Sequence, residues 1–108
     1  MLVNMPVDTA NLNDTDVTVM LRAIADPVRR RIVEMLKQPG CCSIGRKSGL
    51  CACDIEREFE LSQPTISHHL SVLREAGLIE SEKVGQWMWF RRNEATLKQL
   101  ARALGSAL

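Results

Sequence analysis

Several features that quickly assign a sequence to a class are scarce here. The chain has no tyrosine, two tryptophans and two phenylalanines in 108 residues, and its net charge is only +1. So small a charge gives no global argument for nucleic acid or membrane binding, so local arrangement must decide. No apolar run approaches the ~20 residues of a membrane helix, and residues 1–16 lack the basic start and apolar core of a signal peptide. We therefore expect a cytoplasmic protein with no membrane partner.

Cysteine is confined to one short stretch, which holds Cys41, Cys42, Cys51 and Cys53. Disulfides rarely serve as permanent staples in the cytoplasm. Four thiols so close together favour a chemical role over four separate small core side chains. The spacing lacks the C-x₂₋₄-C pairs of a closed zinc site, so we do not expect a structural zinc.

The apolar pattern divides the chain into an arm and one domain. Residues 1–15, rich in Asn, Asp and Thr, are predicted to form a flexible arm, and residues 16–108 one small domain. A first helix is predicted where Val17, Met20, Leu21 and Ile24 recur at helical spacing. Asp26 and Pro27 then resemble the N-cap and first residue of a second helix, which Pro39 and Gly40 end.

The middle and end of the chain predict a helix-turn-helix followed by a hairpin. A short helix from Asp54 is followed, after a turn near residues 60–62, by a helix capped by Ser62 and stopped at Gly77. Alternating residues on both sides of Gly85 indicate a β-hairpin, and residues 94–108 a last helix. The predicted fold is mainly α (α+β): a winged helix-turn-helix with extra N- and C-terminal helices for dimerisation.

Polar side chains mark the leading end of the second helix of this motif. Short hydroxyls, amides and imidazoles at that position suit base edges in the major groove and nearby phosphates. Basic side chains of the hairpin could grip the flanking backbone. The alternative is an ordinary solvated helix beside a structural hairpin. The predicted DNA-binding residues are Ser62, Gln63, Thr65, Ser67, His68, His69, Lys83, Arg91 and Arg92.

The thiols form two unlike pairs. In a regular helix, residues two apart point in different directions, so Cys51 and Cys53 can share an ion only before or at a helix start. Asp54, as the N-cap of the short helix, would place them there. A helix N-terminus also favours the thiolate, which is the form that binds soft metals. Cys41 and Cys42, by contrast, are adjacent in a glycine-rich segment.

A resemblance to a known family unites these motifs. The segments "ADPVRRRIVEML", "LCACDI" and "LSQPTISHHLSVLREAGLI", with the hairpin after them, resemble the ArsR/SmtB family of bacterial metalloregulatory repressors. The resemblance implies a homodimer, paired through its first and last helices, that binds double-stranded operator DNA without a required cofactor. It also implies release from the operator when an inducer is sensed.

The cysteine box suggests what the inducer is. "LCACDI" resembles the box of arsenic-responsive members, and Cys51 and Cys53 match two of its three thiols, but Glu56 occupies the third position. As(III) and Sb(III), which prefer three thiolates, are therefore the candidate inducers. Cys41 or Cys42 would supply the missing ligand.

A redox switch is the alternative. Adjacent cysteines have Cα atoms ~3.8 Å apart, below the usual disulfide minimum of ~4.4 Å, so a Cys41–Cys42 disulfide would be strained and readily reduced. Such a bond suits a repressor that senses peroxide or sulfur species. An enzyme is not expected, because the chain has no C-x-x-C, no phosphate-binding loop and no βαβ pattern.

Overall fold

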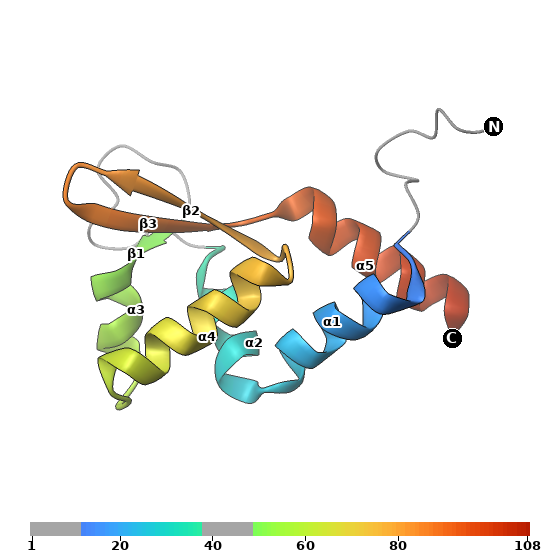
Figure 1. The fold of residues 1–108 in the computed structure, drawn as a ribbon, viewed down its shortest axis with the longest axis horizontal. Coiled ribbons are helices and arrows are strands. Elements are labelled where there is room, and N and C mark those ends of the chain that lie inside the picture. Colours follow the sequence, from blue (N-terminus) through green and yellow to red (C-terminus); the bar gives the residue numbers. More distant parts are fainter. Residues whose placement is uncertain (1–11, 38–48) are drawn as a thin grey trace.

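The computed structural model of the chain describes residues 12–37 and 49–108 (Figure 1). The elements of this part are α1 (Asp14–Ala25), α2 (Pro27–Met35), β1 (Leu50–Cys51), α3 (Ala52–Glu58), α4 (Gln63–Glu75), β2 (Ile79–Val84), β3 (Trp87–Arg92) and α5 (Glu94–Ala107). The small sheet and α3 lie at one end of the molecule, and α1 and α5 at the other. The predicted winged helix-turn-helix with extra terminal helices is confirmed.

One apolar core joins the helices to the sheet. Its most completely buried side chains include Ile32 of α2, Ile55 of α3, Ile66 and Leu73 of α4, and Leu78 just before β2. Burying a side chain of this size stabilises the fold by about 1.5–3 kcal/mol. The core thus fixes α3 and α4, the two helices of the helix-turn-helix, against α2.

The N-terminal helix begins earlier than predicted. Asn13 caps it in a capping box with Asp16, so Asp14 and Thr15 of the predicted arm belong to α1, while residues 1–11 lie outside the described residues. In no part of the described chain does a helix combine the length and apolar character needed to cross a membrane.

The C-terminal end of α1 is capped by side chains from α2. The last four carbonyl groups of a helix have no partner within it, and in α1 they belong to residues 22–25. The guanidinium groups of Arg29 and Arg30 donate to all four. The N···O distances are 2.6 Å to Ala23, 3.3 Å to Arg22, and 2.9 Å to both Ile24 and Ala25. Two arginines of the "RRR" run therefore stabilise the α1–α2 corner.

The hairpin is confirmed, and its central strand has a second partner. β2 and β3 pair antiparallel around the turn at Gly85, whose φ is +62°. On its other edge β3 pairs with β1, which places Leu50 opposite Phe90 and Cys51 opposite Trp89. No pattern in the sequence predicts β1.

This strand also corrects the predicted start of α3. The helix begins at Ala52 with Cys51 as its N-cap, so Asp54 lies inside the first turn and is not the cap. The reason is long-range: pairing with β3 holds Cys51 in extended backbone, and the helix can begin only at the next residue. Asp54 still benefits from its position, since a carboxylate in the first turn complements the helix dipole.

Gly49 allows β1 to approach β3 closely. Its φ is +98°, and a Cβ atom there would lie 2.6 Å from Nε1 of Trp89 and 2.7 Å from the carbonyl oxygen of Phe90. Both the backbone angle and the space exclude other residues.

We therefore expect Gly49→Ala to lower the free energy of unfolding by about 2–4 kcal/mol, since strain and overpacking add. Gly85→Ala is the matched control. It also has a positive φ but nothing within 4 Å, so it should cost only about 1 kcal/mol. Urea denaturation of the two variants measures the difference, and equal losses would contradict the steric argument.

Candidate nucleic-acid interface and thiol site

The leading end of α4 presents a polar surface. Ser62 caps the helix by accepting a hydrogen bond from the Thr65 amide at 3.3 Å, and the two hydroxyls lie 2.7 Å apart. Ile66, Leu70 and Leu73 face the core. Five of the predicted DNA-binding residues remain exposed on this helix and its cap: Ser62, Gln63, Thr65, Ser67 and His68.

His69 differs from these residues. The residue is partly buried, and its Nδ1 lies 3.0 Å from Nη1 of Arg29 on α2. Burial lowers the pKa of His69 below 6.5, and the positive charge of Arg29 acts in the same direction, against the opposing effect of Asp26. The neutral ring is therefore favoured, and His69 faces a neighbouring helix in addition to solvent.

The pKa of Asp26 is also displaced. Burial alone would raise it, but hydrogen bonds from the amides of Arg29 and Val28 and the nearby positive charges hold it below its usual value. Asp26 is thus a charged cap for α2, as predicted from the Asp-Pro pair.

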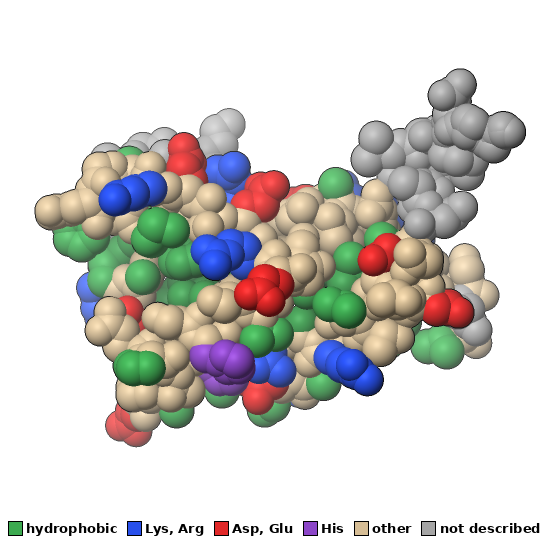
Figure 2. Space-filling model, viewed as in Figure 1, with side chains coloured by type: hydrophobic (Ala, Val, Ile, Leu, Met, Phe, Trp, Pro, Cys, Tyr) green, Lys and Arg blue, Asp and Glu red, His purple; other side chains and the backbone are tan. Residues whose placement is uncertain are grey.

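The hairpin is less basic than its sequence indicates. Arg91 donates to Glu80 and Glu82 of β2 at 3.1 Å each. Arg92 donates to Glu94 at 2.7 Å and to the carbonyl oxygen of Val33 at 3.1 Å. The hydrogen bond from Arg92 lowers the pKa of Glu94. Figure 2 shows acidic and basic side chains next to one another over the hairpin.

Lys83 is exposed near the hairpin tip. It and the α4 residues could meet phosphate directly, whereas Arg91 and Arg92 would first have to exchange their carboxylate partners. The pairing of Arg91 with Glu80 and Glu82 was not predicted, although the register of the two hairpin strands could be derived from the sequence. A two-residue turn at Gly85 and Gln86 places Glu80 opposite Arg91.

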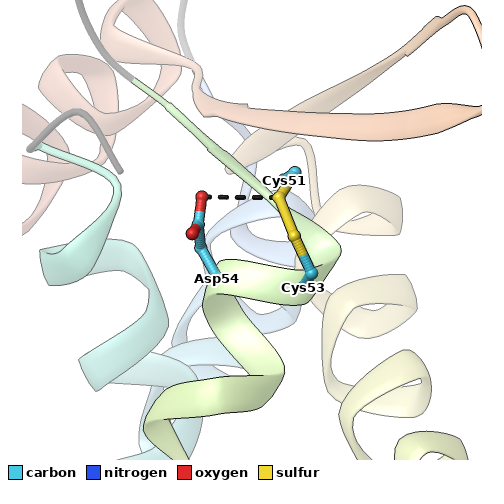
Figure 3. Close-up of side chains that lie close together, drawn as sticks. All are labelled: Cys51, Cys53 and Asp54. Carbon is cyan, nitrogen blue, oxygen red and sulfur yellow. Dashed lines mark hydrogen bonds between the residues drawn. A yellow bond between two sulfur atoms is a disulfide. The ribbon is translucent and has the colours of Figure 1, made fainter. Parts of the chain in front are cut away.

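The thiol site lies where β1 becomes α3. The sulfur atoms of Cys51 and Cys53 are joined in a disulfide, with Cα atoms 5.4 Å apart (Figure 3). Cys51 is 2% exposed, and the neighbouring Asp54 carboxylate is also buried. The predicted placement of both thiols at a helix start is thus correct, although the N-cap is Cys51 itself. Cys41 and Cys42 lie outside the described residues.

Asp54 is a member of this site that the sequence analysis did not assign to it. Its Oδ2 lies 3.4 Å from Sγ of Cys51, and its Oδ1 lies 3.5 Å from Nη1 of Arg57. In the disulfide form Cys51 has no proton, so the first contact is a hydrogen bond only when the thiol is reduced and donates. Its position three residues after Cys51, in the first helical turn, was the available signal.

The three side chains could hold a metal or metalloid when the sulfurs are reduced. One ligand atom from each of Cys51, Cys53 and Asp54 lies within 4.8 Å of the others. Two sulfurs and one carboxylate oxygen suit a soft or borderline centre. A cavity of about 530 Å³ lined by residues of α2, β1 and α3 borders Asp54.

Comparisons with known proteins identify relatives of this chain. Residues 26–81 match the family described as "Bacterial regulatory protein, arsR family". The arsenic resistance transcriptional regulator of Pseudomonas putida is 37% identical over 68% of this chain, but only 51% of its own length is covered. The arsenical resistance operon repressor of Staphylococcus aureus is 33% identical over 82% of this chain and 77% of its own.

Solved structures agree on the fold. The solution structure of a homodimeric winged helix-turn-helix domain from Mycobacterium bovis superposes with a TM-score of 0.63 and 21% identity. The superposition covers 90% of each chain. At this level of identity the likeness concerns the fold alone.

Proposed function

Since the chain belongs to the ArsR family of bacterial regulatory proteins, and is therefore a DNA-binding transcription regulator and not an enzyme, we propose how it works. It acts in the cytoplasm as a homodimeric repressor. α4 binds operator DNA, and reaction of the thiols at the start of α3 releases the protein from that DNA. The observation that carries this proposal is the position of the Cys51–Cys53 pair between the hairpin and α3, the first helix of the helix-turn-helix.

That juxtaposition supplies the mechanism. Cys51 pairs with Trp89 in the hairpin and also begins α3, which packs on α4 through the core. A change in the distance between Cys51 and Cys53 therefore acts on the hairpin and on the helix-turn-helix together. Turning a 99:1 equilibrium into 1:99 needs about 5.5 kcal/mol of differential affinity, a value that covalent change at two sulfurs can supply.

The proposed inducer is arsenite or antimonite. Each reduced thiol would displace one hydroxyl of As(OH)₃, so that Cys51 and Cys53 form two As–S bonds and release two waters. The third sulfur that As(III) prefers would come from Cys41 or Cys42, since Glu56 occupies the third position of the cysteine box. The names of the Staphylococcus aureus and Pseudomonas putida relatives support an arsenical inducer.

A second candidate is redox sensing, which the Cys51–Cys53 disulfide favours. In this case hydrogen peroxide would oxidise two thiols to one disulfide and be reduced to two waters. The switch would involve Cys51 and Cys53 in place of, or besides, Cys41 and Cys42. Both chemistries use the same sulfur pair, so oxidation would block the binding of arsenite.

The interface with DNA is tested first. A library of random duplexes, selected for binding, should yield one enriched operator sequence. Gln63→Ala and Ser67→Ala should each weaken binding to it by about 1–3 kcal/mol, because base-edge contacts are lost without a change in the core. Glu75→Gln, exposed at the opposite end of α4, is the control. Operator affinity unchanged in both α4 variants would show that another surface reads the bases.

The thiols are tested by release of that operator. Arsenite should release the reduced protein, whereas Cys51→Ser and Cys53→Ser should each raise the arsenite concentration required by at least about 10-fold. The double variant Cys41→Ser with Cys42→Ser separates the two pairs. If it too loses the response, the 41–42 pair supplies an essential ligand. Release by peroxide but never by arsenite would favour redox sensing instead.

The dimer interface is proposed on α1 and α5. Met20 and Ala23 face the core, but Leu21, which the periodicity predicts among the apolar positions of α1, is 38% exposed, and Val19 is 43% exposed. These side chains lie on α1, which is adjacent to α5 at one end of the molecule (Figure 1). Exposed apolar side chains on the helices that the family uses for pairing favour a second copy of this chain as their partner.

Val19→Glu and Leu21→Glu should therefore shift the protein to a monomer, because a buried unpaired carboxylate costs several kcal/mol in an interface. Sedimentation velocity measures the change. Trp87→Glu is the matched control, since Trp87 is 49% exposed but lies on the hairpin. A dimer that persists in both α1 variants would place the interface elsewhere.

A further inference from the structure

One guanidinium group connects three helices. Arg29 of α2 donates through Nε and Nη2 to carbonyl oxygens of Ala23 and Arg22 at the end of α1, and its Nη1 lies 3.0 Å from Nδ1 of His69 on α4. The contact with His69 spans 40 positions in the sequence. Figure 2 shows histidine side chains reaching the surface over α4, next to a basic side chain.

The chemistry of this contact determines the state of the histidine ring. Arginine only donates hydrogen bonds, so Nδ1 of His69 must be the acceptor and Nε2 must carry the proton. A protonated ring would have no acceptor at Nδ1 and would repel the guanidinium. The charged or titratable groups that act on His69 are Asp26 from the α1–α2 corner, Arg29 from α2 and His68 from α4 itself.

We propose that Arg29 and His69 are positioning residues that hold the recognition helix α4 at a set orientation to α1. The inference rests on the proposed function, in which α1 pairs the two copies of the chain and α4 reads the operator. The orientation of α4 relative to α1 then sets the separation of the two recognition helices, on which binding of two half-sites depends. Arg29 and His69 thereby contribute to operator specificity without contacting a base.

The structure of the contact explains why few residues could replace this pair. Arg29 uses the separate nitrogens of a planar fork to reach acceptors on two different helices. A lysine has one nitrogen and cannot reproduce the fork. At position 69 an asparagine would place its amide oxygen near the site of Nδ1, whereas the amide of glutamine lies one bond further from the backbone.

The test compares four variants on the operator selected as above. Arg29→Lys and His69→Gln should lower the ratio of operator affinity to non-specific DNA affinity by roughly 10-fold, the loss of one charge-assisted hydrogen bond. His69→Asn should retain the ratio within about twofold. Arg30→Lys is the matched control: Arg30 also caps α1, but its two hydrogen bonds reach only carbonyls of α1. It should lower the melting temperature and leave the ratio unchanged.

A second measurement does not depend on the variants folding. A two-bond ¹H–¹⁵N correlation spectrum of the wild type should show the His69 ring protonated at Nε2 and unprotonated at Nδ1 at pH 7. A proton on Nδ1 would overturn the inference. So would an unchanged affinity ratio in His69→Gln, or equal losses in His69→Asn and His69→Gln. If the wild type selects no sequence, the proposed function fails instead.

Discussion

The pairing of β1 with β3 is the constraint on which the rest of the site depends. Two residues, Leu50 and Cys51, form the whole strand, and they face Phe90 and Trp89 of the hairpin. This pairing fixes Cys51 in extended backbone, so α3 begins immediately afterwards, with Cys53 and Asp54 in its first turn. The chemistry of two thiols is thereby placed at the junction of the sheet and the helix-turn-helix.

The helices and the hairpin could be predicted from the sequence because their signals are local. Ser62 and Pro64 mark the start of α4, its apolar stripe marks the buried face, and Gly85 marks the hairpin turn. These features depend on propensity, capping and turn chemistry, which act over a few residues. The predicted positions of Cys51 and Cys53 at a helix start were correct, although Asp54 is not the N-cap and the pairing of β1 with β3 fixes where α3 begins.

The features that could not be predicted depend on distant partners. β1 is too short to give a periodic pattern, and it exists because β3 lies beside it. The contact of His69 with Arg29, 40 positions away, was not visible in the sequence, which predicted only that His69 contacts DNA with its neighbours. The ion pairs of Arg91 and Arg92 differ from these two cases, because their partners are local: Glu94 lies two residues after Arg92, and the hairpin register places Glu80 opposite Arg91. For β1 and for the Arg29–His69 contact, the partner was not visible in the local sequence.

The brevity of β1 also bears on how the thiol site can change in evolution. An insertion of one residue beside Cys51 would turn its side chain to the opposite face of the sheet and separate it from Cys53. The sulfur pair thus depends on the register of β1 with β3. Substitution, and not a change in chain length, is therefore the route by which this site can vary in evolution without losing the sulfur pair.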